Sequence, residues 1–139
     1  GDSVKNVVLL HSTNGAIPPK MPKSVSLPVN APVKAVHILG GVAGWGSPYG
    51  RKGSTSLIVR LHYKDGKTED HALKNGEEVA DYIRRVDVPG SKFAFDLNGR
   101  QVRYLTVTPG RPNVIKQIEF VKGDDVTAPV VVAVTIEGK

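Results

Sequence analysis

The sequence predicts an all-β fold, an antiparallel β-sandwich of jelly-roll type with one short helix. Apolar residues recur at every second position in short runs along most of the 139 residues, and this period places them on one face of a strand. Asp-Gly and Asn-Gly dipeptides stand between neighbouring runs and are strong hairpin signals. About nine runs joined by short turns are typical of a sandwich or barrel.

The first predicted strands precede the glycine-rich stretch. Lys5–Leu10 is a short apolar run. Ser12–Pro22 is predicted to be a loop because its prolines block ladder hydrogen bonds. Lys23–Val29 alternates apolar and polar residues, and Pro28 on its outer face indicates an edge strand. Val33–Leu39 is the third run.

The next two strands, Ser56–Tyr63 and Thr68–Leu73, form a hairpin about Asp65-Gly66. A two-residue turn would place Arg60 opposite His71, whereas a three-residue turn with a bulge would place Arg60 opposite Asp70. Either register sets complementary charges on an exposed face. The spacing does not require a zinc site.

Four more strands complete the sheet. Lys92–Leu97 and Val102–Thr108 flank Asn98-Gly99, and Val114–Val121 and Pro129–Glu137 follow. Because Pro129–Glu137 is apolar on both faces, we expect it to be central and covered, or packed on a partner. The predicted core residues are Val59, Leu61, Tyr63, Ile118, Phe120, Val131, Ala133 and Thr135, with Val130, Val132, Val134 and Ile136 facing the other way.

The one predicted helix lies within Gly76–Val86, chiefly Glu77–Arg84. Val79, Tyr82, Ile83 and Val86 have helical spacing. Asn75 is a suitable N-cap, and the charges at both ends complement a helix dipole.

The amino-acid composition limits the classes of chemistry and of partner that the chain can have. The chain has no cysteine, which excludes disulfides and thiolate chemistry, and no apolar run reaches the roughly 18 residues of a membrane span. Its net charge of +6 favours an acidic partner, but there is no long basic block, and we expect no nucleic acid to bind. Gly1 is not a natural start, so we expect one domain, residues 1–139, excised or processed from a longer chain.

Enzyme signatures are missing, and we predict a non-catalytic protein without cofactor or metal. The P-loop, the G-x-S-x-G elbow and H-E-x-x-H do not occur. Glu77 with Asp81 could be taken for glycosidase carboxylates, which leaves a hydrolase as the less favoured alternative. Calcium would find oxygen ligands in Asp65, Asp70, Asp124 and Asp125, but their spacing is not that of an EF-hand.

The chain's one tryptophan, Trp45, stands in the glycine-rich stretch "LGGVAGWGSPYGRKGS". An exposed aromatic plane beside hydrogen-bond donors suits a sugar, which has an apolar face and a polar rim. The candidate ligand-binding residues are therefore Trp45 and Tyr49 for stacking, and Arg51 and Arg84 as donors. The alternative is that Trp45 folds back as a structural plug over the end of the sandwich.

The segments "VHILGGVAGWG", "VRLHYKDGKTEDHAL" and "NGEEVADYI" resemble galactose-binding-like jelly-roll domains. Such domains accompany bacterial extracellular enzymes, including those of planctomycete-type bacteria. The resemblance extends over Val25–Glu137 and implies a carbohydrate-binding accessory module in a periplasmic or secreted protein. The matching residues are Leu39, Gly40, Gly41, Trp45, Tyr63, Asp65, Gly66, Asn75, Gly76, Asp81 and Tyr82.

These relatives usually carry another strand before the segment "NVVLL". The resemblance therefore implies either an open sheet edge or excision from a longer polypeptide. The second functional hypothesis follows from such an edge: a structural or protein–protein interaction domain, without a small ligand, that docks onto a neighbouring domain or subunit.

Overall fold

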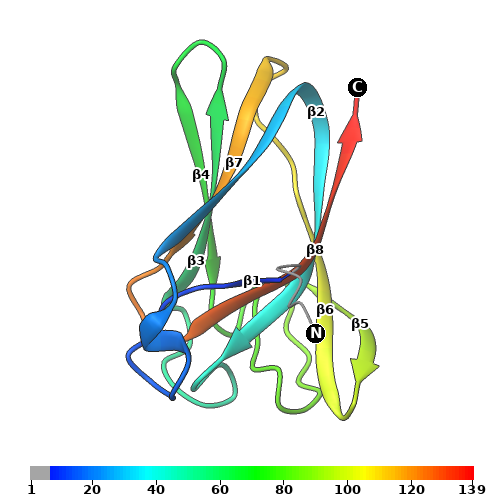
Figure 1. The fold of residues 1–139 in the computed structure, drawn as a ribbon. Helices are drawn as coiled ribbons and strands as arrows, with labels where there is room; N and C mark the ends of the chain where they lie inside the picture. The colour runs from blue at the N-terminus through cyan, green and yellow to red at the C-terminus, as the bar shows by residue number, and fades with distance from the viewer. Residues whose placement is uncertain (1–6) are drawn as a thin grey trace, which may run out of the picture.

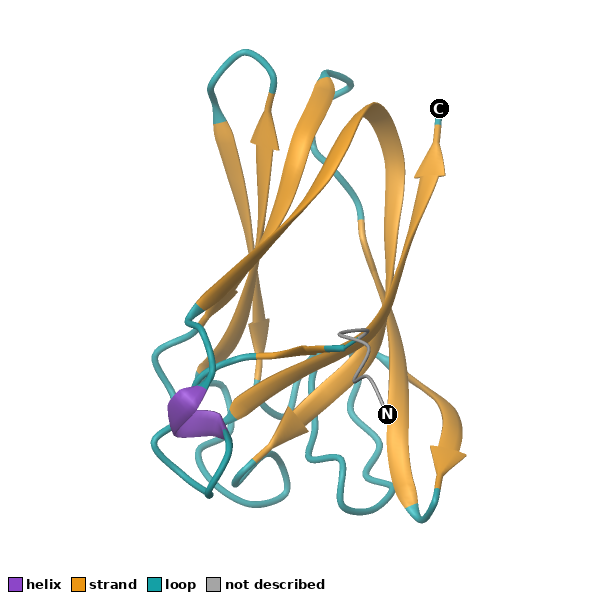
Figure 2. Ribbon diagram, viewed as in Figure 1, coloured by secondary structure: helices purple, strands orange, loops and turns teal. Residues whose placement is uncertain are grey.

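A computed structural model describes residues 7–139 of the chain. Over this range the protein is all-β with one 3-10 turn (Figures 1 and 2), which confirms the predicted class. No helix in the described range is long and apolar enough to cross a bilayer. The elements are β1 (Val8–Leu9), η1 (Pro18–Lys20), β2 (Ser24–Ala43), β3 (Thr55–Tyr63), β4 (Thr68–Lys74), β5 (Lys92–Leu97), β6 (Arg100–Val107), β7 (Val114–Lys122) and β8 (Ala128–Gly138).

All pairs of named strands are antiparallel, in the order β1-β8-β2-β7-β3-β4, with β5 joined to β2 through β6. The long strand β2 connects the two halves of this sheet (Figure 1). Its residues 24–32 pair with β7, and its residues 33–43 pair with β8 and β6. The two strands predicted at Lys23–Val29 and Val33–Leu39 are thus one strand. A register shift between Pro28 and Ala31 bends it, with Asn30 at a φ of 55°.

One hydrophobic core draws side chains from both halves of the sheet. Val59, Leu61, Tyr63, Ile118, Phe120 and Val131 are buried in it, as predicted. Ala133 and Thr135 are exposed instead, and Val134 and Ile136 pack against the core.

A β-bulge explains this correction. Gly40 pairs with Val131 but Leu39 pairs with Ala133, so Val132 is an extra residue in β8. Because side chains alternate between faces, one inserted residue exchanges the two faces beyond it. Strand β8 lies between β1 and β2, but β1 pairs with it only at Val130 and Val131.

Both predicted hairpins form. At Asp65-Gly66 the structure selects the register that pairs Arg60 with Asp70, and Arg60 Nε and Nη2 donate to the two carboxylate oxygens at 2.8 and 3.0 Å. At the other hairpin, Asn98 and Gly99 have φ values of 53° and 80°, as a type I′ turn requires.

The predicted helix at Gly76–Val86 is wrong. The segment forms a turn and bends, and Ile83, on the expected apolar face, is 54% exposed. Gly76 has a φ of 81°, outside the helical region. The Ala80 carbonyl accepts the Val42 amide at 3.2 Å, and the Tyr82 amide donates to the Val42 carbonyl at 2.9 Å. These contacts with β2 outweigh the weak helix preference of a short segment.

The N-terminal predictions hold in part. Lys5–Leu10 was predicted to be a strand; residues up to 6 lie outside the described range, and Val8–Leu9 is β1. Ser12–Pro22 is irregular as expected, except that Pro18–Lys20 makes one 3-10 turn that starts with proline. Proline suits this position because a first-turn residue needs no hydrogen-bonded N–H.

Candidate functional site

The loop between β2 and β3, residues 44–54, is closed by one buried asparagine. Asn75 follows β4 and is 1% exposed. Its side-chain carbonyl accepts the Ser47 amide at 2.6 Å, and its side-chain amide donates to the Arg51 carbonyl at 3.1 Å. Its backbone carbonyl accepts the Gly53 amide at 2.7 Å. The glycine-rich loop is therefore held in a defined shape.

Asp81 fixes the start of the same loop. One carboxylate oxygen accepts the Gly46 amide at 3.0 Å, and the other accepts the Ile83 amide at 2.9 Å. The Asp81 amide in turn donates to the Ser47 carbonyl at 2.9 Å. Asp81 is 1% exposed, and both of its carboxylate oxygens are engaged by backbone amides.

Trp45 is not a plug. The residue is 59% exposed, which overturns the alternative that it folds over the end of the core. Val42 and Ala80 are fully buried there. Small residues let the loop curl tightly instead: a Cβ on Gly50 would lie 2.2 Å from the Trp45 carbonyl oxygen, and one on Gly46 would lie 2.5 Å from the Val42 side chain.

Tyr49 and Arg84 lie beside Trp45. The Trp45 and Tyr49 rings meet edge to face, with centroids 6.2 Å apart at 84°. Arg84 Nε donates to the Tyr49 hydroxyl at 3.1 Å, and its guanidinium carbon lies 5.7 Å from the Tyr49 ring centroid. Two aromatic surfaces and a donor thus form one exposed cluster.

Arg51, the fourth predicted residue, shares a small cavity with Trp45. The cavity has a volume of about 280 Å³. Asp124, an exposed acid, and Val126, 49% exposed, form part of its wall. The structure thus brings all four predicted residues to one end of the strands. The lining residues are Trp45, Arg51, Ser54, Asn75, Asp124, Asp125, Val126 and Thr127.

Asp125 forms the polar wall of this cavity, and the sequence did not single it out for that role. Its carboxylate accepts hydroxyl hydrogen bonds from Ser54 at 2.8 Å, Ser56 at 2.5 Å and Thr127 at 2.6 Å. Lys122 Nζ lies 3.1 Å away. Burial raises the pKa of Asp125, but the hydrogen bonds from Ser56, Thr127 and Ser54 outweigh it and lower that pKa below its usual value.

The acids considered for calcium are not brought together. Asp70 pairs with Arg60, and Asp65 pairs with Arg111; both pairs belong to the hairpin of β3 and β4 or its neighbouring loop. The other two acids lie at the opposite end of these strands. Within residues 7–139, no group of three or more His, Cys, Asp or Glu side chains could hold a metal ion.

The hairpin histidines pair with separate acids. His62 Nε2 lies 2.8 Å from a Glu119 carboxylate oxygen, and His71 contacts Glu69. His62 pairs with Thr68 and His71 with Val59 along the ladder, so the two rings project from opposite faces. They do not converge as ligands of one metal would.

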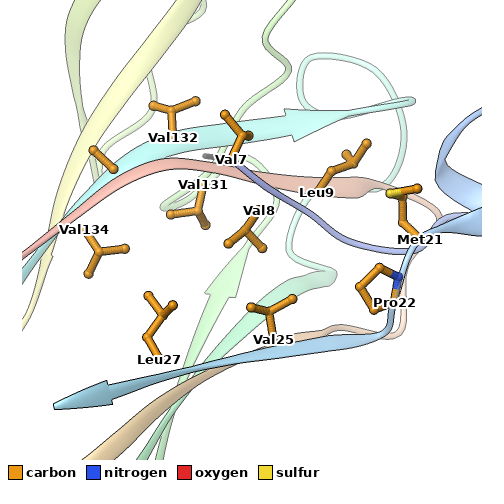
Figure 3. Close-up of a pocket in the computed structure, with 11 residues that line it drawn as sticks. Val7, Val8, Leu9, Met21, Pro22, Val25, Leu27, Val131, Val132 and Val134 are labelled. Atoms are coloured by element: carbon orange, nitrogen blue, oxygen red, sulfur yellow. The ribbon is translucent and has the colours of Figure 1, made fainter. Parts of the chain in front are cut away.

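A larger cavity lies away from this cluster, between β1, β8 and the first part of β2. Its volume is about 810 Å³. In Figure 3, Val8, Val131 and Val134 point towards Val25 and Leu27 across it. We call it the apolar groove. Every lining residue is apolar: Val7, Val8, Leu9, Met21, Pro22, Val25, Leu27, Val131, Val132, Ala133 and Val134.

Comparison of this chain with protein-family models, with curated proteins and with solved structures found no match.

Proposed function

We propose that this chain is a non-catalytic carbohydrate-binding accessory module of an extracytoplasmic bacterial protein, periplasmic or secreted. One observation carries the proposal: Trp45 is 59% exposed on a loop that the buried side chains of Asn75 and Asp81 hold in place. An exposed indole on a fixed loop offers a preformed flat surface. Such a surface matches the C–H face of a pyranose ring.

The polar neighbours suit the rim of a sugar. Trp45 and Tyr49 would stack on sugar rings, and Arg51 and Arg84 would donate to hydroxyl or acid groups. The small cavity beside Trp45 offers the Asp124 carboxylate as an acceptor. A net charge of +6 favours acidic polysaccharides over neutral ones.

The arrangement of strands supports a galactose-binding-like β-sandwich as the finer description of the fold. The two halves of the sheet pack on one core, as the two layers of a sandwich do. The candidate site lies on loops at one end of these strands, and binding residues of β-proteins are commonly placed on such loops.

The test compares Trp45→Ala with the unmodified chain. We expect migration through gels that contain polysaccharide to be retarded for the unmodified chain, and Trp45→Ala to weaken binding about tenfold or more, because buried aromatic contacts dominate recognition. Since Trp45 is the one tryptophan, its fluorescence reports binding to the unmodified chain directly.

Ile17→Ala is the matched control, because Ile17 is 60% exposed and is remote from the cluster in sequence. It should bind as the unmodified chain does. Circular dichroism checks the fold of both variants. Retardation of Trp45→Ala equal to that of the unmodified chain, or loss of its folded spectrum, would contradict the proposal.

The apolar groove favours a second candidate, a docking module for a neighbouring domain or subunit. Within the described chain, β8 has β1 as its second neighbour only at Val130 and Val131. An extended apolar strand from the partner could pair with the free edge of β8 beyond Val131 and fill the groove, as in β-strand addition. Trp45→Ala would leave this interaction unchanged.

A further inference from the structure

Most arginine side chains have a carboxylate partner among residues 7–139, but three have none there. Arg51, Arg84 and Arg100 form no ion pair with any residue in the range 7–139, and all three are exposed. A guanidinium without an internal acid keeps its donors available to a ligand. The paired arginines are Arg60 with Asp70, Arg85 and Arg103 with Asp87, and Arg111 with Asp65.

Two of the three unpaired arginines rest on tyrosine rings. The guanidinium carbon of Arg84 lies 5.7 Å from the Tyr49 ring centroid, and that of Arg100 lies 5.5 Å from the Tyr82 ring centroid. Stacking on an aromatic face limits the conformations of a long side chain. Arg84 Nε donates to the Tyr49 hydroxyl at 3.1 Å and Arg100 Nη1 to the Asn98 carbonyl at 3.5 Å, and each guanidinium has further N–H groups that can donate to a ligand. An anion that binds there meets donors that are already oriented.

The Arg100 stack is joined to the Trp45 loop through backbone. The Tyr82 carbonyl accepts the Gln101 amide at 2.9 Å, and Gln101 Nε2 donates to the Asp81 carbonyl at 2.8 Å. Asp81 in turn holds Gly46, the neighbour of Trp45. The two surfaces are therefore fixed relative to each other by buried hydrogen bonds.

The acidic residues nearby determine how an acidic ligand would be oriented on this surface. Asp124 lines the cavity on the Trp45 side and would repel an acid group placed there. Asp96, on the same hairpin as Arg100, is engaged by the Gly99 amide at 2.8 Å. An acidic ligand would therefore place its anionic group towards Arg84 and Arg100 and away from Asp124.

We propose that Arg100, stacked on Tyr82, is an anion subsite that binds the carboxylate or sulfate group of an acidic polysaccharide. This inference rests on the proposed function, because the sugar ring of the same polymer stacks on Trp45. Arg84, stacked on Tyr49 beside Trp45, offers a second guanidinium on the Trp45 surface. The site would thus prefer an acidic polymer to a neutral polymer of the same backbone.

The experiment measures dissociation constants for Arg100→Gln from Trp45 fluorescence. The probes are polygalacturonate with its fully methyl-esterified form, and dextran sulfate with dextran. The first pair tests carboxylates and the second tests sulfates. We expect Arg100→Gln to weaken binding of the acidic member of at least one pair about three- to tenfold, as for a lost charge-assisted hydrogen bond at a surface. Binding of the neutral members should be unchanged.

Arg111→Gln is the matched control, because Arg111 also stacks on a tyrosine, Tyr63, with its guanidinium carbon 4.3 Å from the ring centroid. Arg111 is paired with Asp65 in the β3–β4 turn, at the opposite end of the strands from Trp45. It removes the same charge and should leave the preference intact. Arg100→Lys keeps the charge but loses the planar fork, and should bind the acidic polymer more weakly than the unmodified chain.

Four results would overturn the subsite. Equal losses for Arg100→Gln and Arg111→Gln would show that net charge alone acts. Equal losses on acidic and neutral polymers would make Arg100 structural. Neutral binding that depends on Trp45, with no preference for the acidic forms, would remove this subsite and leave the proposed function. Absence of binding to every polymer would overturn both.

Discussion

Trp45 adopts a left-handed backbone conformation, with a φ of 76°, that costs a residue with a side chain about 1–2 kcal/mol. Such strain persists only where the surroundings fix it, and it concentrates at ligand sites. Here the hydrogen bonds of Asn75 and Asp81 hold the loop on both sides of Trp45. The indole contributes little burial, so its removal should affect a ligand far more than stability.

Asp125 makes the stability of this end of the molecule depend on pH. Its pKa is lower in the folded protein than its ordinary value, so the carboxylate contributes stability above the ordinary pKa of about 4. That contribution is lost as the pH falls through the folded-state pKa. We expect Asp125→Asn to destabilise the protein by about 1–3 kcal/mol at neutral pH, because the carboxylate accepts several hydrogen bonds.

Urea denaturation at neutral pH and at about pH 3 checks this expectation. The difference in unfolding free energy between Asp125→Asn and the unmodified chain should shrink at the lower pH. Asp124→Asn is the control. Asp124 is next to Asp125 in the chain, but it is exposed and makes no ion pair with a described residue. Equal effects of the two substitutions would contradict the role of the Asp125 carboxylate in pH-dependent stability.

At the scale of elements, the bulge between β2 and β8 decides which face of β8 is buried. Gly40 lies opposite this bulge, where a Cβ would come within 2.3 Å of the Val130 carbonyl oxygen. Because that neighbour is backbone, it cannot yield as a flexible side chain would. We expect Gly40→Ala to lower the free energy of unfolding by about 1–3 kcal/mol.

Thermal unfolding followed by circular dichroism measures this effect. The matched control is Gly138→Ala, in the last residue of the partner strand β8, where an added Cβ would meet no atom within 4 Å. It should unfold as the unmodified chain does. Unfolding of Gly40→Ala at an unchanged temperature would mean that β8 can pair without this close approach.

At the scale of the whole molecule, the exposed apolar surface falls into separate regions. The loop cluster carries Trp45 and Tyr49, and the apolar groove carries Val7, which is 50% exposed. Sizeable apolar patches on a soluble protein usually mark interaction sites. The two regions correspond to the two candidate functions, and each can be altered without touching the other.

The docking candidate predicts that the groove is open in the isolated chain. Anilinonaphthalene sulfonate should therefore bind with enhanced fluorescence, and Val7→Lys should reduce the enhancement because it places a charge in an apolar wall. Ile17→Lys adds the same charge at a residue that does not line the groove and should have no effect. Light scattering would detect self-association through the free edge of β8 beside the groove. Equal dye binding by both variants would contradict an open groove.

The sequence by itself determined the class of fold and most strands, because alternation of apolar residues and Asn-Gly and Asp-Gly turns are local properties. It also suggested Trp45, Tyr49, Arg51 and Arg84 as candidate ligand-binding residues from their chemistry alone, but it left open whether Trp45 is exposed. Its error at Gly76–Val86 came from the same locality: helical spacing within that segment carried no information about the hydrogen bonds that Ala80 and Tyr82 form with β2.

Only the tertiary structure decided the burial of β8 and the shape of the site. Ala133 and Thr135 face solvent because an extra residue, Val132, enters the ladder opposite Gly40, and a pairing register depends on two distant strands at once. Trp45 is exposed because residues 30 to 36 positions further along the chain, Asn75 and Asp81, hold its loop. Long-range hydrogen bonds and strand register have no local signature in the sequence. In this protein they decide which face of β8 is buried and whether Trp45 is exposed.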